Sequence, residues 1–323
     1  MSTLNAHIAE GNKKTHSMRL CLASDMSVTN VSTCLSLCLT KTVMLLRFPS
    51  RSTIVLPEKL MHWRLHPLVL DERIEEATDI VSGFGDTFTV LPLHASCYNP
   101  YKKSKHRKEA LLSITTIEDA VKNPGLGVPH LYYHKTKYNV SSWMPFTKLC
   151  LNHDTIFMPF GMLNRLPMHF CGKVFIRPDS GNKTFTGFVV DVDDAAEQLE
   201  YYNNFSINKN IMCAVASAKE LPEYEFRFWI VGKKIVTYSS YSHNQKDSRQ
   251  PSKDMIKFIS EYVTEIEQPD VSYVVDAVCS NGNNFIVEMN ATSTSGVYQC
   301  DLNALFKALR DVAIREFNGE VFL

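Results

Sequence analysis

Carboxylate and amide side chains interrupt two of the most apolar segments in the C-terminal half. Asp276 lies within "SYVVDAVCS", and Glu288 and Asn290 lie two residues apart within "NNFIVEMNA". Because side chains two residues apart on a strand point to the same face, these three oxygen donors can converge. Hard oxygen ligands suit Mg²⁺, which takes one or two carboxylates together with phosphate oxygens and water. The pattern indicates a magnesium site; taken alone, it also fits polar residues at the edge of a hairpin.

A second polar pair, Glu225 and Arg227, lies on one face of the apolar strand expected over "EFRFWIV". Arginine is always charged and presents a planar set of donors, which suits it to hold a phosphate or a carboxylate bidentately. The alternative is a structural pairing of Arg227 with Glu225.

A cationic loop follows a strand in "FIRPDSGNKTFTGF", with Arg177 at the end of the strand and Lys183 in the loop. The backbone amides, hydroxyls and ammonium group of such a loop can cover a triphosphate. The sequence contains neither GxxxxGK[ST] nor GxGxxG, so we expect no P-loop and no Rossmann turn to hold the phosphates.

The elements that position these residues follow from apolar periodicity and turn signals. In the N-terminal part we expect a small α/β lobe with a strand over 52–57, a helix over 71–85 and a strand over 86–93. In the C-terminal part we expect helices over 191–204, 252–268 and 302–317, strands within 210–241, and a hairpin over 272–291. Asp301 is the expected N-cap of the last helix.

Two histidine pairs have i, i+4 spacing: His62 with His66, and His130 with His134. On a helix this spacing can offer two imidazoles to zinc, but neither pair has the intervening Glu of HExxH, and the sequence indicates no third ligand. Ordinary packing or surface positions are the favoured interpretation.

The composition is that of an ordinary folded protein, with 323 residues, a formal net charge of zero and 45% hydrophobic residues. These values argue against a disordered chain and against bulk attraction to nucleic acid or anionic membrane. The nine cysteines include no CxxC pair and indicate reduced thiols in the cytoplasm. The apolar run 31–48 is too polar for a membrane span, and the first thirty residues lack the apolar core of a signal peptide.

The chain is expected to divide into an uncertain extension over 1–50, a divergent α/β lobe over 51–150 and a larger domain over 151–323. The basic run from Lys102 to Lys108 has no interleaved aromatic residues. It indicates a solvated loop or helix start, while nucleic-acid binding stays open as a less favoured partner.

Residues from about Asp154 to Phe317 resemble the ATP-grasp superfamily. The motifs are "FIRPDSGNKTFTG", "EFRFWIVGKKIVTYSSY" and "VDAVCSNGNNFIVEMNATSTSG", in the order that superfamily shows. The chain is most similar to the R-to-K clade of phages and bacteria, in which arginine replaces the usual first ATP-binding lysine. The resemblance implies an α+β class. It places an ATP-grasp fold in the C-terminal half, where two α+β subdomains clamp ATP, after a small divergent α/β lobe.

The resemblance also implies roles for individual residues. Arg177 and Arg227 would act as catalytic cations on the transferring phosphoryl group. The residues expected to bind ATP are Arg177, Lys183, Thr184, Gly187, Val215, Ser217, Lys219 and Glu225. The residues expected to hold Mg²⁺ are Asp276, Glu288 and Asn290. Weaker expectations place Ser239, Tyr241 and Ser293 beside the substrate.

The implied function is an ATP- and Mg²⁺-dependent ligase. A substrate carboxylate would attack the γ-phosphate to form an acylphosphate, and an amine or thiol would displace phosphate, leaving ADP. The alternatives are a small-molecule kinase of the ATP-grasp type and a non-catalytic nucleotide-binding protein. The expected partners are ATP, a carboxylate and an amine or thiol acceptor, with no membrane, in the cytoplasm, or in the host cytoplasm if the chain is viral.

Overall fold

The computed structural model describes residues 61–91, 93, 111–124, 127–144, 148–203, 207–220, 222, 224–241 and 249–320. They all fall within one compact unit, Pro57–Leu323. The expected strand over 52–57, the first fifty residues and the basic run at 102–108 lie outside the described residues. Within the described part of the chain, none of the helices has the length and apolar character needed to cross a membrane.

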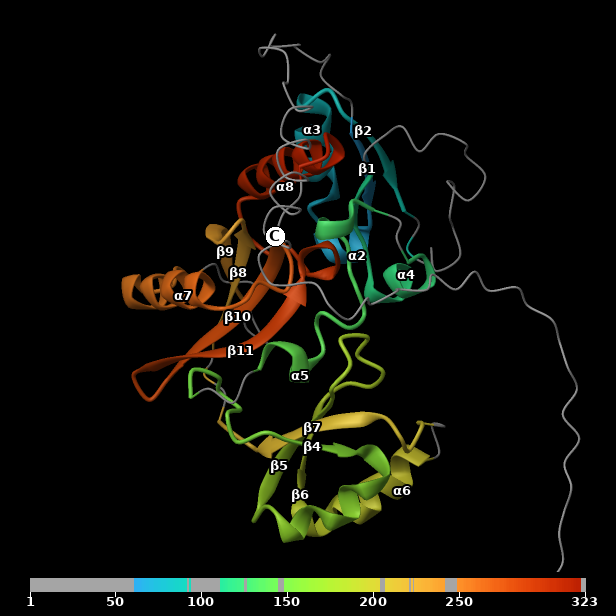
Figure 1. Ribbon diagram of the computed structural model, residues 1–323, viewed down its shortest axis with the longest axis vertical. Coiled ribbons are helices and arrows are strands. Elements are labelled where there is room, and N and C mark those ends of the chain that lie inside the picture. The colour runs from blue at the N-terminus through green and yellow to red at the C-terminus, as the bar shows by residue number, and fades with distance from the viewer. Residues whose placement is uncertain are drawn as a thin grey trace, which may run out of the picture. The chain divides into compact units, whose positions relative to one another are not determined.

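The N-terminal lobe contains a three-stranded parallel sheet (Figure 1). Its strands are β1 (His62–Leu65), β2 (Thr87–Val90) and β3 (Leu111–Ile114), in the order β2-β1-β3. Its helices are α2 (Pro67–Leu70), α3 (Ile74–Gly83) and α4 (Ile117–Lys122). Parallel strands need a crossover connection, and α3 lies in the connection between β1 and β2. The predicted α3 and β2 are present, but β1 and β3 were not predicted.

The histidine pairs therefore do not lie as a shared helical face would require. His62 belongs to β1, and its ring contacts the hydroxyls of Thr87 and Thr89 on β2 at 2.7 and 3.0 Å. His66 is the N-cap of α2, where its ring accepts a hydrogen bond from the backbone of Leu68.

The middle of the chain forms an antiparallel sheet of four strands. The strands are β4 (Ile156–Pro159), β5 (Lys173–Pro178), β6 (Phe188–Asp191) and β7 (Met212–Ser217), in the order β4-β7-β5-β6. The 3₁₀ segments η2 (Phe160–Met168) and η3 (Val192–Asp194) and the helix α6 (Ala195–Asn203) accompany this sheet. Alternate residues of β5, namely Val174 and Ile176, enter the core, which leaves the Arg177 side on the opposite face.

The C-terminal part forms a second antiparallel sheet, which carries most of the predicted site. The strands are β8 (Glu225–Val231), β9 (Lys234–Tyr241), β10 (Ser272–Ser280) and β11 (Asn283–Ala291), in the order β11-β10-β8-β9. The helices are α7 (Lys253–Glu265) and α8 (Leu302–Phe317). The backbone of Ala304 donates to the Asp301 carboxylate at 2.9 Å, so the predicted N-cap of α8 is present.

The two faces of this sheet have different neighbours because strand side chains alternate. Val275 and Ala277 pack in a core that includes the apolar side of α7, whose Ile259 and Val263 are fully buried. Val274 and Trp229 lie on the other face and pack in a core shared with the N-terminal lobe. The site residues lie on this second face, beyond the end of that shared core.

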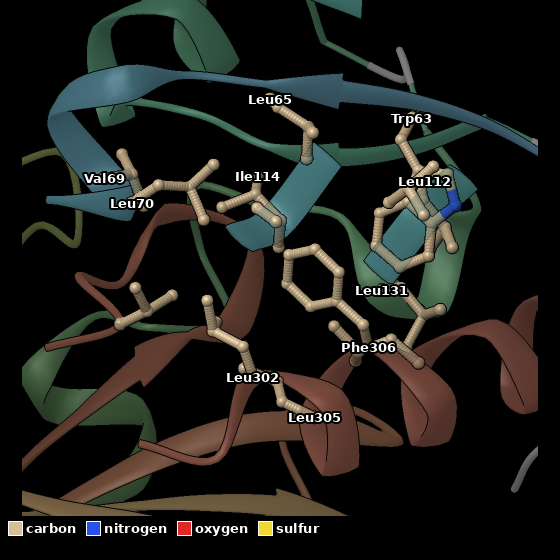
Figure 2. Close-up of a cluster of buried hydrophobic side chains, with 14 of the residues drawn as sticks. Trp63, Leu65, Val69, Leu70, Leu112, Ile114, Leu131, Leu302, Leu305 and Phe306 are labelled. Atoms are coloured by element: carbon tan, nitrogen blue, oxygen red, sulfur yellow. The ribbon is translucent and has the colours of Figure 1, made fainter. Parts of the chain in front are cut away.

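The shared core joins β1 and β3 to α8 (Figure 2). The rings of Trp63 and Phe306 stack with their centroids 4.7 Å apart, and Leu65 and Leu305 are fully buried beside them. Full burial of each such side chain contributes about 1.5–3 kcal/mol. This packing holds the N-terminal lobe against the sheet that carries the site.

Candidate functional site

Four predicted site residues form one row across the C-terminal sheet. The Cα partners run from Glu288 on β11 to Asp276 on β10, then to Arg227 on β8 and Ser239 on β9. Directly opposed residues of antiparallel strands share a face, so the four side chains lie on the same side of the sheet. The row exists because the register of three strand pairs aligns its members.

Asp276 and Arg227 form a buried bidentate ion pair at the centre of the row. Nε and Nη2 of Arg227 each donate to the Asp276 carboxylate at 2.8 Å, and Nη1 donates to the carbonyl of Gly296 at 3.1 Å. The guanidinium also lies 5.0 Å from the ring centroid of Tyr298. The Asp276 side chain is fully buried, so its charge requires this partner. The alternative pairing of Arg227 with Glu225 is not the one that this contact shows.

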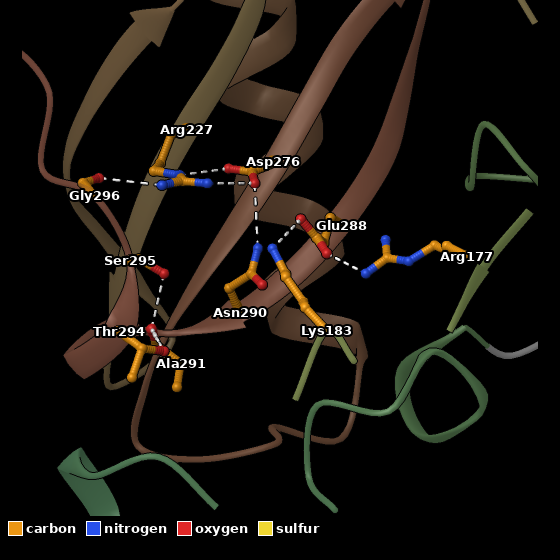
Figure 3. A network of polar contacts seen from close by, with 10 residues as sticks. All are labelled: Arg177, Lys183, Arg227, Asp276, Glu288, Asn290, Ala291, Thr294, Ser295 and Gly296. Carbon is orange, nitrogen blue, oxygen red and sulfur yellow. Dashed lines mark hydrogen bonds and ion pairs between the residues drawn. The ribbon is translucent and has the colours of Figure 1, made fainter. Parts of the chain in front are cut away.

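Glu288 contacts both predicted phosphate-binding cations (Figure 3). Its carboxylate pairs with Arg177 from β5, and with Nζ of Lys183 at 3.4 Å. Burial alone would raise the pKa of Glu288, but the two positive charges outweigh it and lower the pKa to about 2. Glu288 is therefore ionised at neutral pH and joins the two sheets electrostatically.

Asn290 completes the predicted metal-ligand set, and its amide donates to the Asp276 carboxylate at 3.3 Å (Figure 3). Two carboxylates and one amide are oxygen ligands of the kind Mg²⁺ takes when phosphates supply the rest of its coordination. Among the described residues, no cluster of three His, Cys, Asp or Glu side chains could hold a metal by itself. The residues therefore fit an ion bound jointly with a phosphate better than a self-contained metal cage.

The loop after β5 places Lys183 against Glu288. Lys183 has a φ of +49°, a left-handed conformation that L-residues seldom adopt, and its backbone donates to the carbonyl of Ser180 at 3.1 Å. Gly187 ends the loop where the chain passes Phe175, because a Cβ on Gly187 would lie 2.8 Å from Cζ of that ring. Thr184 is exposed.

The segment that precedes the middle sheet braces the start of this loop. The backbone and hydroxyl of Ser141 each donate to the Asp179 carboxylate at 2.8 Å. The backbone of Gly181 donates to the side chain of Asn139 at 3.2 Å. The sequence analysis missed these residues, and the Asn-x-Ser order at 139–141 could only have suggested capping of the short helix α5 (Val140–Trp143).

The predicted adenine hinge has a different set of contacts from the one expected. Val215 is fully buried in the core of the middle sheet. Asp154 accepts hydrogen bonds from the backbone of Ser217 at 3.1 Å and from Nζ of Lys219 at 2.9 and 3.0 Å. Burial raises the pKa of Asp154, but these hydrogen bonds and the Lys219 charge outweigh it, so the net shift is downward.

A pocket of about 580 Å³ opens beside the hinge. The segment from Ala218 to Glu220 lines one part of it, and the β10–β11 turn with Phe285 lines another. A much narrower cavity of about 10 Å³ lies next to Arg177 and Val287, between the two sheets. The larger pocket has room for a ring system, whereas the narrower one holds about one water molecule.

The three weaker substrate positions lie in different surroundings. Ser239 accepts a hydrogen bond from the backbone of Gln299 at 3.2 Å and is a member of the charged row. Tyr241 is the register partner of Glu225 at the end of β9. Ser293 is 1% exposed, and its hydroxyl accepts from the backbone of Tyr133 at 3.0 Å.

Contacts therefore unite one group of the predicted site residues: Arg177, Lys183, Arg227, Ser239, Asp276, Glu288 and Asn290. They do not place Val215, Lys219 or Ser293 in that group.

Comparison with known proteins gives the family context. Residues 161–308 match the model of the ATP-grasp domain, R-to-K clade family 2. No curated protein sequence matches the chain at a significant level. The D-cycloserine synthetase DcsG has a similar fold, with a TM-score of 0.53 at 11% identity over 79% of this chain and 99% of that one.

Two other solved structures have comparable likeness. A RimK domain ATP-grasp protein from Sphaerobacter thermophilus has a TM-score of 0.51 at 13% identity, over 80% of this chain and 98% of that one. A phosphoribosylamine–glycine ligase from Thermotoga maritima has a TM-score of 0.51 at 12% identity, over 81% of this chain and 77% of that one. At such identities the likeness concerns the fold. The C-terminal half of the chain has the ATP-grasp fold, and its sequence resembles the R-to-K clade of that superfamily.

Proposed function

We propose that the chain is an ATP-dependent ligase that joins a carboxylate to an amine or thiol through an acylphosphate. The observation that carries this proposal is the meeting of Glu288 with Arg177 and Lys183, beside the buried Arg227–Asp276 pair. Anionic and cationic groups from two sheets thus face one place, which suits a metal-bound triphosphate. The ligase names of the structures with a similar fold support the reaction class.

ATP and Mg²⁺ are the cofactors of this proposal. Asp276, Glu288 and Asn290 would hold the Mg²⁺ ion, which neutralises charge on the phosphate oxygens when it is bound. Arg177 and Lys183 would contact the phosphates, and the pocket beside Ala218–Glu220 would receive the base.

Arg227 would contact the group being transferred. Its side chain is held rigidly by Asp276 and the Gly296 carbonyl, so little conformational entropy is lost when it binds an anion. A substrate carboxylate is already a nucleophile and needs no base to attack the γ-phosphate. Attack releases ADP and leaves an acylphosphate, from which the acceptor amine or thiol then displaces inorganic phosphate.

Thermal unfolding with and without Mg²⁺-ATP tests the nucleotide site. A ligand at one hundred times its Kd that binds only the folded state adds about 2.7 kcal/mol of stability. We expect this gain in the wild type and its loss in Arg177→Met, which removes the charge. Arg165→Met is the matched control, because Arg165 is an exposed arginine of η2. An equal gain in all three proteins would show that Arg177 has no part in nucleotide binding.

Product analysis tests the reaction. A ligase should release ADP and phosphate only when both a carboxylate and an acceptor are present, with an amide or thioester as product. A stable phosphorylated alcohol formed without any acceptor would show a kinase instead. Binding of ATP without turnover across a carboxylate and amine panel would support a non-catalytic module.

A further inference from the structure

Tyr133 makes contacts at both ends, with parts of the chain far apart in sequence. Its backbone N–H donates to the Ser293 hydroxyl at 3.0 Å, and its phenol donates to the Asn182 side chain at 2.5 Å. The residue is 7% exposed, and its ring stacks on that of Tyr138 with the centroids 6.4 Å apart. Burial raises the pKa of the Tyr133 phenol to about 12, so the hydroxyl keeps its proton and donates at neutral pH.

One end of this connection belongs to the strand that carries the proposed metal ligands. Ser293 lies in the 3₁₀ segment η4 (Thr292–Thr294), three residues after Asn290. Its carbonyl accepts a hydrogen bond from the backbone of Thr115 at 2.7 Å, directly after β3 of the N-terminal lobe. Ser293 is thus a junction between that lobe, β11 and Tyr133.

The other end belongs to the loop proposed to cover the phosphates. Asn182 immediately precedes Lys183, whose ammonium group contacts Glu288. Asp179 and Gly181 are already held by Ser141 and Asn139, so the start of the loop is fixed independently. The phenol of Tyr133 reaches one residue further, to the side chain next to the cation.

We propose that Tyr133 is a positioning residue that holds the phosphate-covering loop against the β11 end of the site, and thereby places Lys183. This inference rests on the proposed nucleotide site. Tyr133 acts through Asn182 and Lys183, so its hydroxyl would affect nucleotide binding without touching the nucleotide.

The test uses the full chain and three variants: Tyr133→Phe, Asn182→Ala and their combination. The probe is the non-hydrolysable analogue AMP-PNP with Mg²⁺, titrated by calorimetry. One neutral hydrogen bond corresponds to about fivefold in affinity. We expect each single variant to raise the Kd about fivefold and the double variant to raise it no further, because both remove the same bond.

Tyr138→Phe is the matched control, because it removes a hydroxyl from the neighbouring stacked ring that makes no hydrogen bond to the described residues of the loop. Hydrogen exchange of the amides from 180 to 187 supplies a second readout that does not depend on nucleotide. We expect faster exchange there in Tyr133→Phe and unchanged exchange in Tyr138→Phe.

The outcomes separate the two proposals. Equal effects of Tyr133→Phe and Tyr138→Phe, or additive effects of the two single variants, would overturn the positioning role. A wild type that does not bind Mg²⁺-AMP-PNP would overturn the nucleotide site. In that case, faster loop exchange in Tyr133→Phe alone supports Tyr133 as the residue that holds the loop, and unchanged exchange refutes it.

Discussion

Replacing Glu288 by glutamine tests the electrostatic connection between the two sheets. Glutamine has the shape of a protonated glutamic acid and cannot ionise, so Glu288→Gln imitates the acid form at every pH. In the wild type, Arg177 and Lys183 outweigh burial and lower the pKa of Glu288 from 4.5 to about 2. The variant leaves both cations without that carboxylate.

The magnitude follows from this shift. Each pKa unit corresponds to 1.36 kcal/mol, so the ionised carboxylate contributes about 3 kcal/mol to folding at neutral pH. The Glu288 side chain is only 15% exposed, so solvent screens the pair weakly. We therefore expect Glu288→Gln to lower the free energy of unfolding by about 3 kcal/mol at pH 7, a large part of a typical stability of about 5–15 kcal/mol.

The pH dependence has a definite direction. Because the folded-state pKa lies below the unfolded one, the stabilisation is complete above about pH 4.5 and is lost as the pH falls through about 2. The difference between wild type and variant should therefore shrink to less than half by pH 3.

Urea unfolding at pH 7, 5, 4 and 3 measures this difference, with the slope m checked for constancy. Glu197→Gln makes the same chemical change at an exposed position of α6, and we expect it to alter stability by less than about 0.5 kcal/mol. A Glu288→Gln protein as stable as the wild type at pH 7 would refute the reasoning. So would a difference that stays constant between pH 5 and pH 3.

Two further substitutions test backbone approach and a buried charge. Gly187→Ala should weaken Mg²⁺-ATP binding roughly tenfold by calorimetry, because the new Cβ would lie 2.8 Å from the Phe175 ring. Gly83→Ala, with no atom within 4 Å of its Cβ, should leave binding unchanged, and equal affinities of the two variants would contradict the steric argument. Asp86→Ala should lower the free energy of unfolding by about 3 kcal/mol in urea, because it removes the fully buried carboxylate that pairs with Arg310. A loss below about 1 kcal/mol would contradict this assignment of Asp86.

The C-terminal elements were more predictable than the N-terminal ones because their periodicity is strong. The helix α7 presents Met255, Ile259 and Val263 on one buried face, and the hairpin turn at Asn281–Gly282 has the positive φ values that Asn and Gly tolerate. In the N-terminal lobe, β1 has only four residues, and the histidine at each end of "HWRLH" suggested a helical spacing instead. A short buried parallel strand has no alternation to distinguish it from other apolar runs.

The sequence by itself determined which side chains could share a face. Glu288 and Asn290 are two residues apart on one strand, as are Glu225 and Arg227 on another, and strand geometry places each pair together without any knowledge of the fold. It also indicated the chemistry, because carboxylate and amide oxygens beside arginine suit a metal and a phosphate wherever they lie.

Only the tertiary structure decided which of these groups meet. Arg227 pairs with Asp276 rather than with Glu225 in its own strand because β8 and β10 are neighbours in register. Arg177 and Lys183 reach Glu288 from another sheet, and Tyr133 links the loop to Ser293 across 160 residues of sequence. Such contacts depend on strand order and on how loops pack, which are long-range consequences of burying the apolar faces together and have no local signature in the chain.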